Sequence, residues 1–444
     1  MPVLNILKFY HKVNFQEVYM MSNRNYDVII AGGGLSGVAA AAASAREGCS
    51  VLVAEQYGFL GGMATAGLVN PFMPYTIRKS GQEYTRQDEV NRGIFREILE
   101  NLAELDGLHP NRQTFNEEIL KLVLDRMMKK YNVKVIFHSF LTGAKRTENK
   151  IETISIANKS GTAEYSARYF VDATGDADLS AYAGCEFKIG REGDHLCQPM
   201  TLCFRLANVD RTKYKKGADR TAVNEKYKEF KRKGLISNPR EDVLVFDHMV
   251  DDILHFNSTR IIKKCGVDAE DMSEAEIQAR EQVYELFRFM KENIPGFENA
   301  QLLMTAAQTG VRESRRIVGE YTITEEDLLN TIKFPDSIAR GTYPVDIHNP
   351  GGSGTVIKHI PLGDYYTIPY RALLPKGIDN LITAGRPISS THEAHSAYRV
   401  MPICTCIGEG AGVAAAVALK GNQACRDADV EKIHEILDKN GALY

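Results

Sequence analysis

The segment 26–55, YDVIIAGGGLSGVAAAAASAREGCSVLVAE, constrains the fold more than any other part of the chain. It begins with a short apolar run, typical of a buried parallel strand, that leads directly into Gly32-x-Gly34-x-x-Gly37. An alanine-rich stretch that favours a helix follows, and a second apolar run ends at Glu55. This order of strand, glycine-rich turn, helix and strand predicts a βαβ unit that binds a dinucleotide.

Each glycine of the turn has a physical task. Gly32 permits the tight turn, Gly34 lets the backbone approach a pyrophosphate, and Gly37 lets the helix pack close to the strand. The helix N-terminus, at Leu35 and Ser36, offers unpaired N–H groups and a partial positive charge to the phosphates.

Glu55 strengthens this interpretation because it lies 18 residues after Gly37. A carboxylate at that distance can accept hydrogen bonds from ribose hydroxyls. An acid there disfavours a 2′-phosphate, so NADP fits this site poorly. An ordinary glycine-rich turn in some other α/β fold would leave Glu55 unexplained.

Length and composition limit the remaining choices. The chain has 444 residues, enough for two domains or for one large domain with an insertion. A net charge of −3 argues against nucleic acid or an anionic membrane surface as the main partner. No run approaches 18 consecutive apolar residues, so we expect no membrane span. Residues 1–20 lack the features of a signal peptide, and we interpret them as an N-terminal extension.

The eight cysteines are scattered and form no CxxC motif, so the sequence predicts no metal site. Cys404-x-Cys406 is the closest pair, and we interpret it as two small apolar residues beside a helix start. Reduced thiols in a cytoplasmic enzyme fit this pattern best.

The chain changes character along its length. Periodic apolar positions predict helices within 88–131, a strand of the same sheet at 133–137, and a hairpin formed by 151–156 and 164–171. Beyond the hairpin, the pattern predicts a strand at 201–206 and helices at 211–234 and 272–292. Glycine and alanine become frequent again from Tyr366. We therefore predict one domain formed by 21–185 and 350–444, with a mixed α/β substrate domain, 186–349, inserted into it.

Four sequence blocks resemble a known family. They are AGGGLSG…VLVAE (31–55), FLGGMATAG (59–67), VDATGDADLSAYAG (171–184) and NLITAGRPISSTHEAHSAYRVMPICTCIGEGAGVAAAVAL (380–419), with a weaker one at 309–329. In order and spacing the chain resembles the FAD-dependent oxidoreductases of the glutathione-reductase-like superfamily, with fumarate reductase flavoproteins as more distant relatives. The resemblance implies an α/β fold with a Rossmann-like FAD-binding domain, and FAD rather than NAD at the first site.

The resemblance also implies roles for residues in these blocks. The loop after the second strand would pass along the pyrophosphate and flavin, and Thr174-Gly175-Asp176 would run beside the cofactor. Gly408–Gly412 would open a helix whose N-terminus points at the flavin, with Arg386 near phosphate or flavin. The predicted cofactor-binding residues are Gly32, Gly34, Leu35, Ser36, Gly37, Glu55, Gly61, Gly62, Thr65, Thr174, Gly175, Asp176, Gly385, Arg386, Gly408, Gly410, Ala411 and Gly412. Related enzymes with covalent FAD carry a histidine in the early flavin loop. Residues 58–75 contain none, so we expect non-covalent FAD.

Three residues are the catalytic candidates. His395 and Arg399 are four residues apart and share a face if 393–400 is helical, with Pro402 stopping that helix. His395 could take a proton as hydride leaves for the flavin, while Arg399 and Arg312 could hold an acidic substrate. A structural histidine and a salt-bridge network remain alternatives. Asp346 and His348 would share one face of an extended segment, and an active-site role is open for them.

The sequence therefore predicts an FAD-dependent oxidoreductase that transfers a hydride between a small polar organic substrate and flavin N5. Two rivals stay open: an oxidase that passes electrons to O₂, and a non-catalytic flavin-binding redox sensor. The expected partners are a small-molecule substrate and an unknown electron acceptor, with no nucleic acid and no membrane span. A homo-oligomer is compatible with the sequence.

Overall fold

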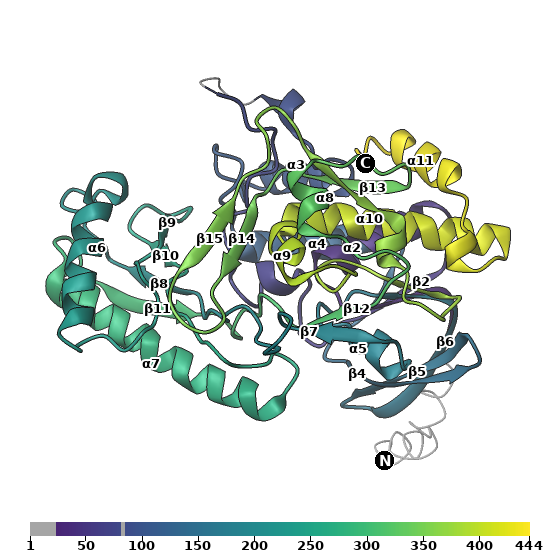
Figure 1. Ribbon diagram of the computed structural model, residues 1–444, viewed down its shortest axis with the longest axis horizontal. Coiled ribbons are helices and arrows are strands. Elements are labelled where there is room, and N and C mark those ends of the chain that lie inside the picture. The colour runs from purple at the N-terminus through teal and green to yellow at the C-terminus, as the bar shows by residue number, and fades with distance from the viewer. Residues whose placement is uncertain (1–23, 81–84) are drawn as a thin grey trace, which may run out of the picture.

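The computed structural model describes residues 24–80 and 85–444 (Figure 1). The predicted extension at 1–20 lies outside these residues. A seven-stranded sheet organises the larger part of the chain, in the order β3-β2-β1-β6-β5-β4, with β17 also paired to β6. Its strands are β1 (Asn25–Ala31), β2 (Val51–Ala54), β3 (Lys134–Ile136), β4 (Phe140–Thr147), β5 (Lys150–Asn158), β6 (Gly161–Asp172) and β17 (Leu381–Thr383).

The sheet is parallel where the predicted βαβ unit lies and antiparallel at one edge. β1 pairs in parallel with β2 and β6, and β2 pairs in parallel with β3. β4, β5 and β6 form an antiparallel extension. The strand predicted at 133–137 is confirmed as a member of this sheet, and the predicted hairpin is confirmed as β5 and β6.

Both faces of the parallel strands are covered, which explains their nearly continuous apolar sequences. Alternate residues enter opposite cores: Val28 and Ile30 of β1 join one apolar cluster, and Ile29 and Ala31 join another. The first cluster includes the helices α2 (Leu35–Arg46), α3 (Ile94–Glu104), α4 (Glu117–Lys130), α10 (Met401–Gly421) and α11 (Val430–Lys439). The second is closed by α5 (Asp178–Tyr182).

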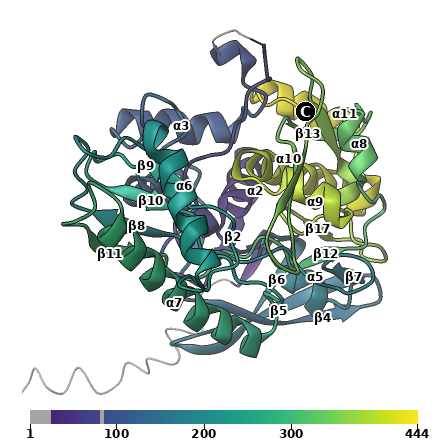
Figure 2. The ribbon, with the colours of Figure 1, turned by 60° about the vertical axis from the view of Figure 1, so that its left-hand side comes forward.

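α2 and α10 pack closely against each other at the centre of the molecule (Figure 2). α2 consists mainly of alanine and glycine, and α10 carries alanine and glycine along much of its length, so their backbones can approach closely. A Cβ atom on Gly408 would collide with the backbone of Ser36, and one on Gly412 would collide with the backbone of Ala40.

α10 is long and apolar enough to cross a membrane, with a mean hydropathy of 1.6 over its most apolar window. However, 94% of that window is buried inside the protein, as expected for the core helix of a globular fold. Among the described residues it is the only helix that meets the length and hydropathy criteria.

A second, smaller unit lies beside the sheet, at the left of Figure 1. Its four-stranded sheet has the order β11-β8-β10-β9 and packs against two long helices. The elements are β8 (Phe204–Ala207), β9 (Val245–Asp247), β10 (Leu254–Phe256), β11 (Gln301–Thr305), α6 (Lys216–Arg232) and α7 (Ala269–Asn293). The predicted helices at 211–234 and 272–292 correspond to α6 and α7. The strand predicted at 201–206 begins three residues later.

Three small two-stranded sheets complete the fold. They pair β7 (Phe187–Ile189) with β12 (Arg315–Ile317), β13 (Ser337–Gly341) with β16 (Tyr366–Pro369), and β14 (Val345–His348) with β15 (Thr355–Lys358). The short helices α8 (Glu325–Leu329) and α9 (His392–Tyr398) lie between β12 and α10 in the sequence. Apart from Leu68, the apolar core of the second unit contains residues from Met200 to Val311. This stretch is narrower than the predicted 186–349, and the domain boundaries stay predictions.

Candidate active site

A cavity of about 450 Å³ runs past the carboxyl ends of the parallel strands and on to the second unit. Its wall includes Gly32 after β1, Glu55 after β2, Thr174 after β6 and Ala384 after β17. The second unit contributes further residues, Asn257 among them. Ligands of open α/β sheets bind at this edge, because strand ends and helix N-termini meet there.

The glycine-rich turn forms one end of the cavity. Gly34 is the N-cap of α2, and this helix has neither a side-chain cap nor an acidic residue in its first turn. Its first N–H groups are therefore free for a bound anion. Gly32 has φ of +97°, and a Cβ on it would lie 2.5 Å from the Ala173 carbonyl oxygen. A Cβ on Gly37 would overlap the Gly32 carbonyl, so Gly37 serves helix packing and lies outside the wall.

A second glycine-rich loop lies beside the first. Gly61 bridges to Gly34, and a Cβ on Gly62 would come within 2.9 Å of the Gly34 Cα. Both glycines line the cavity, whereas Thr65 donates its hydroxyl to the Leu60 carbonyl at 2.8 Å and does not. The two loops thus form a concave surface of backbone atoms, the glycine cradle. Side chains in place of these glycines would occupy the space inside it.

Glu55 is buried in the wall at the end of β2. Its Oε2 accepts a hydrogen bond from the Gly33 amide at 2.6 Å, and its Oε1 accepts one from the Tyr57 amide at 2.8 Å. Burial raises the pKa of this carboxyl against the effect of both bonds. Each oxygen keeps a second lone pair for a ligand hydroxyl.

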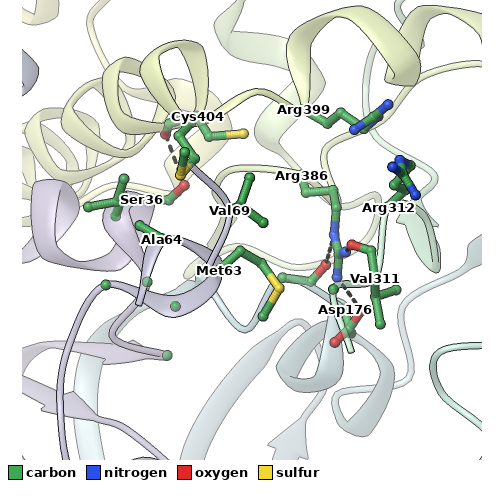
Figure 3. Close-up of a pocket in the computed structure, with 18 of the residues that line it drawn as sticks. Ser36, Met63, Ala64, Val69, Asp176, Val311, Arg312, Arg386, Arg399 and Cys404 are labelled. Atoms are coloured by element: carbon green, nitrogen blue, oxygen red, sulfur yellow. Dashed lines mark hydrogen bonds and ion pairs between the residues drawn. The ribbon is translucent and has the colours of Figure 1, made fainter. Parts of the chain in front are cut away.

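Thr174, Gly175, Asp176 and Arg386 also line the cavity. Figure 3 shows Arg386 beside Asp176. The Arg386 guanidinium forms an ion pair with Asp176 and donates to the Gly175 carbonyl at 2.8 Å and to the Val311 carbonyl. Arg386 therefore joins the loop after β6 to the start of the segment that returns from the second unit.

Three further arginines line the cavity. Arg240 is paired with Asp242 at 2.9 Å, whereas Arg312 and Arg399 lie at the far end (Figure 3). Arg312 donates to the Pro199 carbonyl and the Thr201 hydroxyl, both at 2.6 Å. Arg399 is 3.5 Å from the side-chain oxygen of Gln198. Within residues 24–80 and 85–444, no carboxylate lies within ion-pair distance of either guanidinium. Burial and the charge of Arg399 lower the pKa of Arg312 to about 9.

Tyr343, Asp346 and His348 also line the cavity, close enough to these arginines for Asp346 and His348 to feel their charges. The Tyr343 hydroxyl donates to Asp346 Oδ2 at 2.9 Å, and His348 Nε2 lies 3.6 Å from the same oxygen. The Ser396 hydroxyl accepts a hydrogen bond from the Asp346 amide at 2.9 Å. Alternation along β14 places Asp346 and His348 on one face, as the sequence pattern predicted. Tyr343 gave no signal in the sequence.

The comparison with protein families decides the identity. A family model described as FAD dependent oxidoreductase matches residues 27–437. The chain belongs to this family. FAD is therefore its cofactor, and the protein is an FAD-dependent oxidoreductase.

A comparison with solved structures finds similar proteins at low sequence identity. A geranylgeranyl bacteriochlorophyll reductase-like protein from Thermoplasma acidophilum is 14% identical, covers 94% of this chain and 83% of its own, and has a TM-score of 0.45. The flavin-dependent brominase Bmp2 is 13% identical with a TM-score of 0.47, over 94% of this chain and 84% of that one. The p-nitrophenol 4-monooxygenase PnpA from Pseudomonas putida DLL-E4 is 12% identical with a TM-score of 0.43, over 93% and 84%. No curated protein sequence gives a match.

At the end formed by the two glycine-rich loops, the cavity of this oxidoreductase fits FAD. The glycine cradle, the uncapped N-terminus of α2 and the buried acid after β2 are what a pyrophosphate and a ribose require. The predicted cofactor residues in the wall are Gly32, Gly34, Leu35, Ser36, Glu55, Gly61, Gly62, Thr174, Gly175, Asp176 and Arg386. Outside the wall lie Gly37, Thr65, Gly385, Gly408, Gly410, Ala411 and Gly412.

The helix expected to begin at Gly408 begins at Met401 instead. Pro402 occupies its first turn, where a missing N–H costs nothing, and does not stop the preceding helix. Val400, Met401 and Cys404 line the cavity, so the N-terminus of α10 does face it. Gly408, Gly410 and Gly412 lie further along and serve packing.

His395 lies away from the cavity. Its side chain is fully buried, does not line the wall, and packs edge-on against Tyr398 at 5.7 Å between ring centres. α9 ends at Tyr398, and Arg399 is its C-cap. Burial and the charge of Arg316 lower the pKa of His395 well below its usual value. The position of His395 therefore does not support direct proton exchange with a substrate in this cavity.

Proposed function

We propose that this oxidoreductase transfers a hydride between a small, polar, anionic substrate and flavin N5 of non-covalently bound FAD. Bound FAD supplies a two-electron acceptor that a protein side chain cannot replace. The substrate binds at the Arg312 end of the cavity, and the residues of the glycine cradle would hold FAD.

The pair of unmatched arginines carries this proposal. A guanidinium that is half-buried loses part of its hydration, and this costs free energy unless an anion or several acceptors compensate it. Arg312 has only neutral acceptors, and Arg399 has a single distant one within the described part of the chain. A substrate carboxylate between them would supply the missing charge and accept hydrogen bonds from both.

The surrounding elements support the same orientation. The N-terminus of α10 has no side-chain cap and no acid in its first turn, so its partial positive charge also favours an anion in the cavity. Arg386 is already paired with Asp176 and holds the wall in place. The substrate anchors are therefore Arg312 and Arg399.

An absorbance spectrum of the purified protein, before and after acid precipitation, is the first test. Flavin bands released into the supernatant support a non-covalent cofactor, and bands that stay in the pellet contradict it. Anaerobic addition of small acids and neutral sugars then shows which class bleaches the flavin. Bleaching by sugars alone would overturn the anionic substrate, and peroxide formed in air would identify an oxidase.

Replacing Arg312 tests the anchor directly. We expect Arg312→Gln to weaken binding of a small anion such as oxalate by about 10- to 100-fold, because a charged hydrogen bond contributes about 1.5–3 kcal/mol. The measurement is titration of the flavin spectrum of the holoenzyme with oxalate. Arg288→Gln, on the exposed face of α7, is the matched control and should bind as the unaltered protein does. Equal affinity in both variants would contradict the proposal.

A further inference from the structure

Within the described part of the chain, one oxygen of the Asp346 carboxylate accepts a hydrogen bond from the protein and the other does not. Tyr343 donates to Oδ2, and His348 lies beside the same atom. Among the described residues, none donates a hydrogen bond to Oδ1, and the carboxylate lines the cavity. A carboxylate oxygen in the cavity wall that lacks a protein donor can accept a hydrogen bond from a bound ligand.

The neighbours of Asp346 fix its protonation state. Burial acts to raise the pKa of this carboxyl, but the contact with His348, the charge of Arg399 and the Tyr343 hydrogen bond outweigh burial, so the pKa lies below its usual value. Asp346 is therefore ionised. Burial and the neighbouring Asp346 raise the pKa of Tyr343, so its hydroxyl keeps the proton that it donates.

His348 cannot perform the same task. Its Nδ1 lies 3.2 Å from Arg260 Nη2 and 3.2 Å from the Thr355 hydroxyl. A guanidinium has no acceptor atom, so Nδ1 must be the acceptor and the proton resides on Nε2, facing Asp346. Burial and the charge of Arg312 lower the pKa of His348 to about 3, which keeps the ring neutral. His348 thus positions the carboxylate and has no free lone pair for a substrate.

We propose that Asp346 Oδ1 accepts the hydroxyl proton of the substrate, and that the substrate is a hydroxy acid. This inference rests on the function proposed above, which supplies the two anchors for the carboxylate and the flavin as hydride acceptor. The O–H bond breaks and its proton moves to Oδ1. The C–H bond on the same carbon breaks with both electrons as a hydride, and a C=O bond forms. The proton then leaves Asp346 for water.

A weak base is sufficient for this step. As hydride leaves the carbon, the hydroxyl oxygen becomes that of a protonated carbonyl, which is a much stronger acid than an alcohol. A saturated acid would instead require removal of a C–H proton, for which a carboxylate of lowered pKa is poorly suited.

The charges around the cavity also favour a hydroxyl over an ammonium group. Arg312 and Arg399 have no carboxylate partner among residues 24–80 and 85–444. Arg260 lies 2.9 Å from Glu241. With the substrate carboxylate bound, the two guanidiniums are balanced by that carboxylate and by Asp346, so an ammonium would add an unbalanced positive charge that a neutral hydroxyl avoids.

The test is anaerobic reduction of the holoenzyme by hydroxy acids, the matching saturated acids and the matching amino acids. We expect bleaching by a hydroxy acid only, and a rate about 100-fold or more lower in Asp346→Asn. Oxalate, an unreactive probe, should bind about 3- to 10-fold more tightly to this variant, because a negative charge beside the arginines is gone. A merely structural role would weaken oxalate binding. Asp251→Asn, an exposed residue of the second unit, is the control.

Tyr343→Phe covers the case in which Asp346→Asn does not fold or retain flavin. It leaves the carboxylate and removes one hydrogen bond to it, so we expect reduction to slow by about 3- to 10-fold. An unchanged rate in both variants, or bleaching by amino acids and not by hydroxy acids, would overturn the inference. Loss of oxalate binding in Arg312→Gln would still stand in that case, so the proposed function is judged separately.

Discussion

At the scale of single residues, burial in the core can decide whether a side chain is ionised, as Glu409 shows. Glu409 of α10 is buried, accepts a hydrogen bond from the Ile94 amide at 2.8 Å, and lies 3.7 Å from an Arg46 nitrogen. Burial raises the pKa of Glu409 to about 7 despite both contacts. The folded protein therefore binds a proton between about pH 4.5 and 7 that the unfolded chain has released.

Stability should consequently fall as the pH rises through that window. We expect Glu409→Gln to reduce the loss of unfolding free energy between pH 5 and pH 8 by about 1–3 kcal/mol, because an amide does not ionise. Denaturant unfolding at the two pH values measures this difference. Glu435→Gln on the exposed face of α11 should leave the pH dependence unchanged. A parallel pH dependence in all three proteins would refute this account.

Residue roles were predictable where a local pattern determines them. Gly32, Gly34 and Glu55 belong to one contiguous motif, and the structure places all three in the cavity wall. His395 was chosen from its spacing to Arg399, but its ring is buried against Tyr398 and only Arg399 reaches the cavity. The position of Tyr343 in the cavity wall depends on how β14 packs against residues far away in the sequence, and no local sequence pattern reveals this.

At the scale of elements, the contact between α2 and α10 determines where the phosphate-binding turn lies. The Ser36 hydroxyl donates to the Cys404 carbonyl at 2.9 Å, and Ser44 donates to the Gly412 carbonyl at 2.9 Å. These bonds join the two helices near their cavity ends and again two turns further along. A change in their separation would move the N-terminus of α2.

Gly412→Ala tests this dependence. Its Cβ would collide with the Ala40 carbonyl, so we expect a loss of about 1–3 kcal/mol in unfolding free energy and weaker FAD retention. Gly217→Ala is the control, because a Cβ there meets nothing within 4 Å. Melting temperature and the flavin-to-protein ratio after gel filtration report the two effects. Unchanged values for Gly412→Ala would show that the helices can separate without consequence.

Most elements were predictable because their apolar periodicity is local. The βαβ unit, the hairpin and the long helices of the second unit follow such patterns. The start of α10 was missed because Pro402 has two opposite meanings, a stop for the preceding helix or the first turn of the next. Sequence alone does not distinguish them, since the choice depends on how α10 packs against α2.

At the scale of the whole molecule, a buried ion pair connects the two units. Arg205 of β8 pairs with Glu117, the first residue of α4, and Asn70 also donates to Glu117 at 2.9 Å. Both charged side chains are almost fully buried. The pair therefore lies at the contact between the second unit and the helical layer over the larger sheet.

Removing one partner should leave a buried charge without compensation. We expect Arg205→Met to lower the unfolding free energy by about 3–5 kcal/mol, and Arg205→Met combined with Glu117→Gln to recover most of that loss. A double-mutant cycle by denaturant unfolding measures the coupling. Additive effects of the two changes would exclude a direct interaction.

β6 pairs with strands from distant parts of the chain, and this has a consequence during protein synthesis. Its last residues, Phe170, Val171 and Asp172, pair with β17, which follows about 200 residues later. A ribosome that adds roughly 5–20 residues per second leaves that strand edge without its partner for roughly 10–40 s. Because unpaired edges promote aggregation, the nascent chain exposes a site for pairing with other chains until β17 has been made.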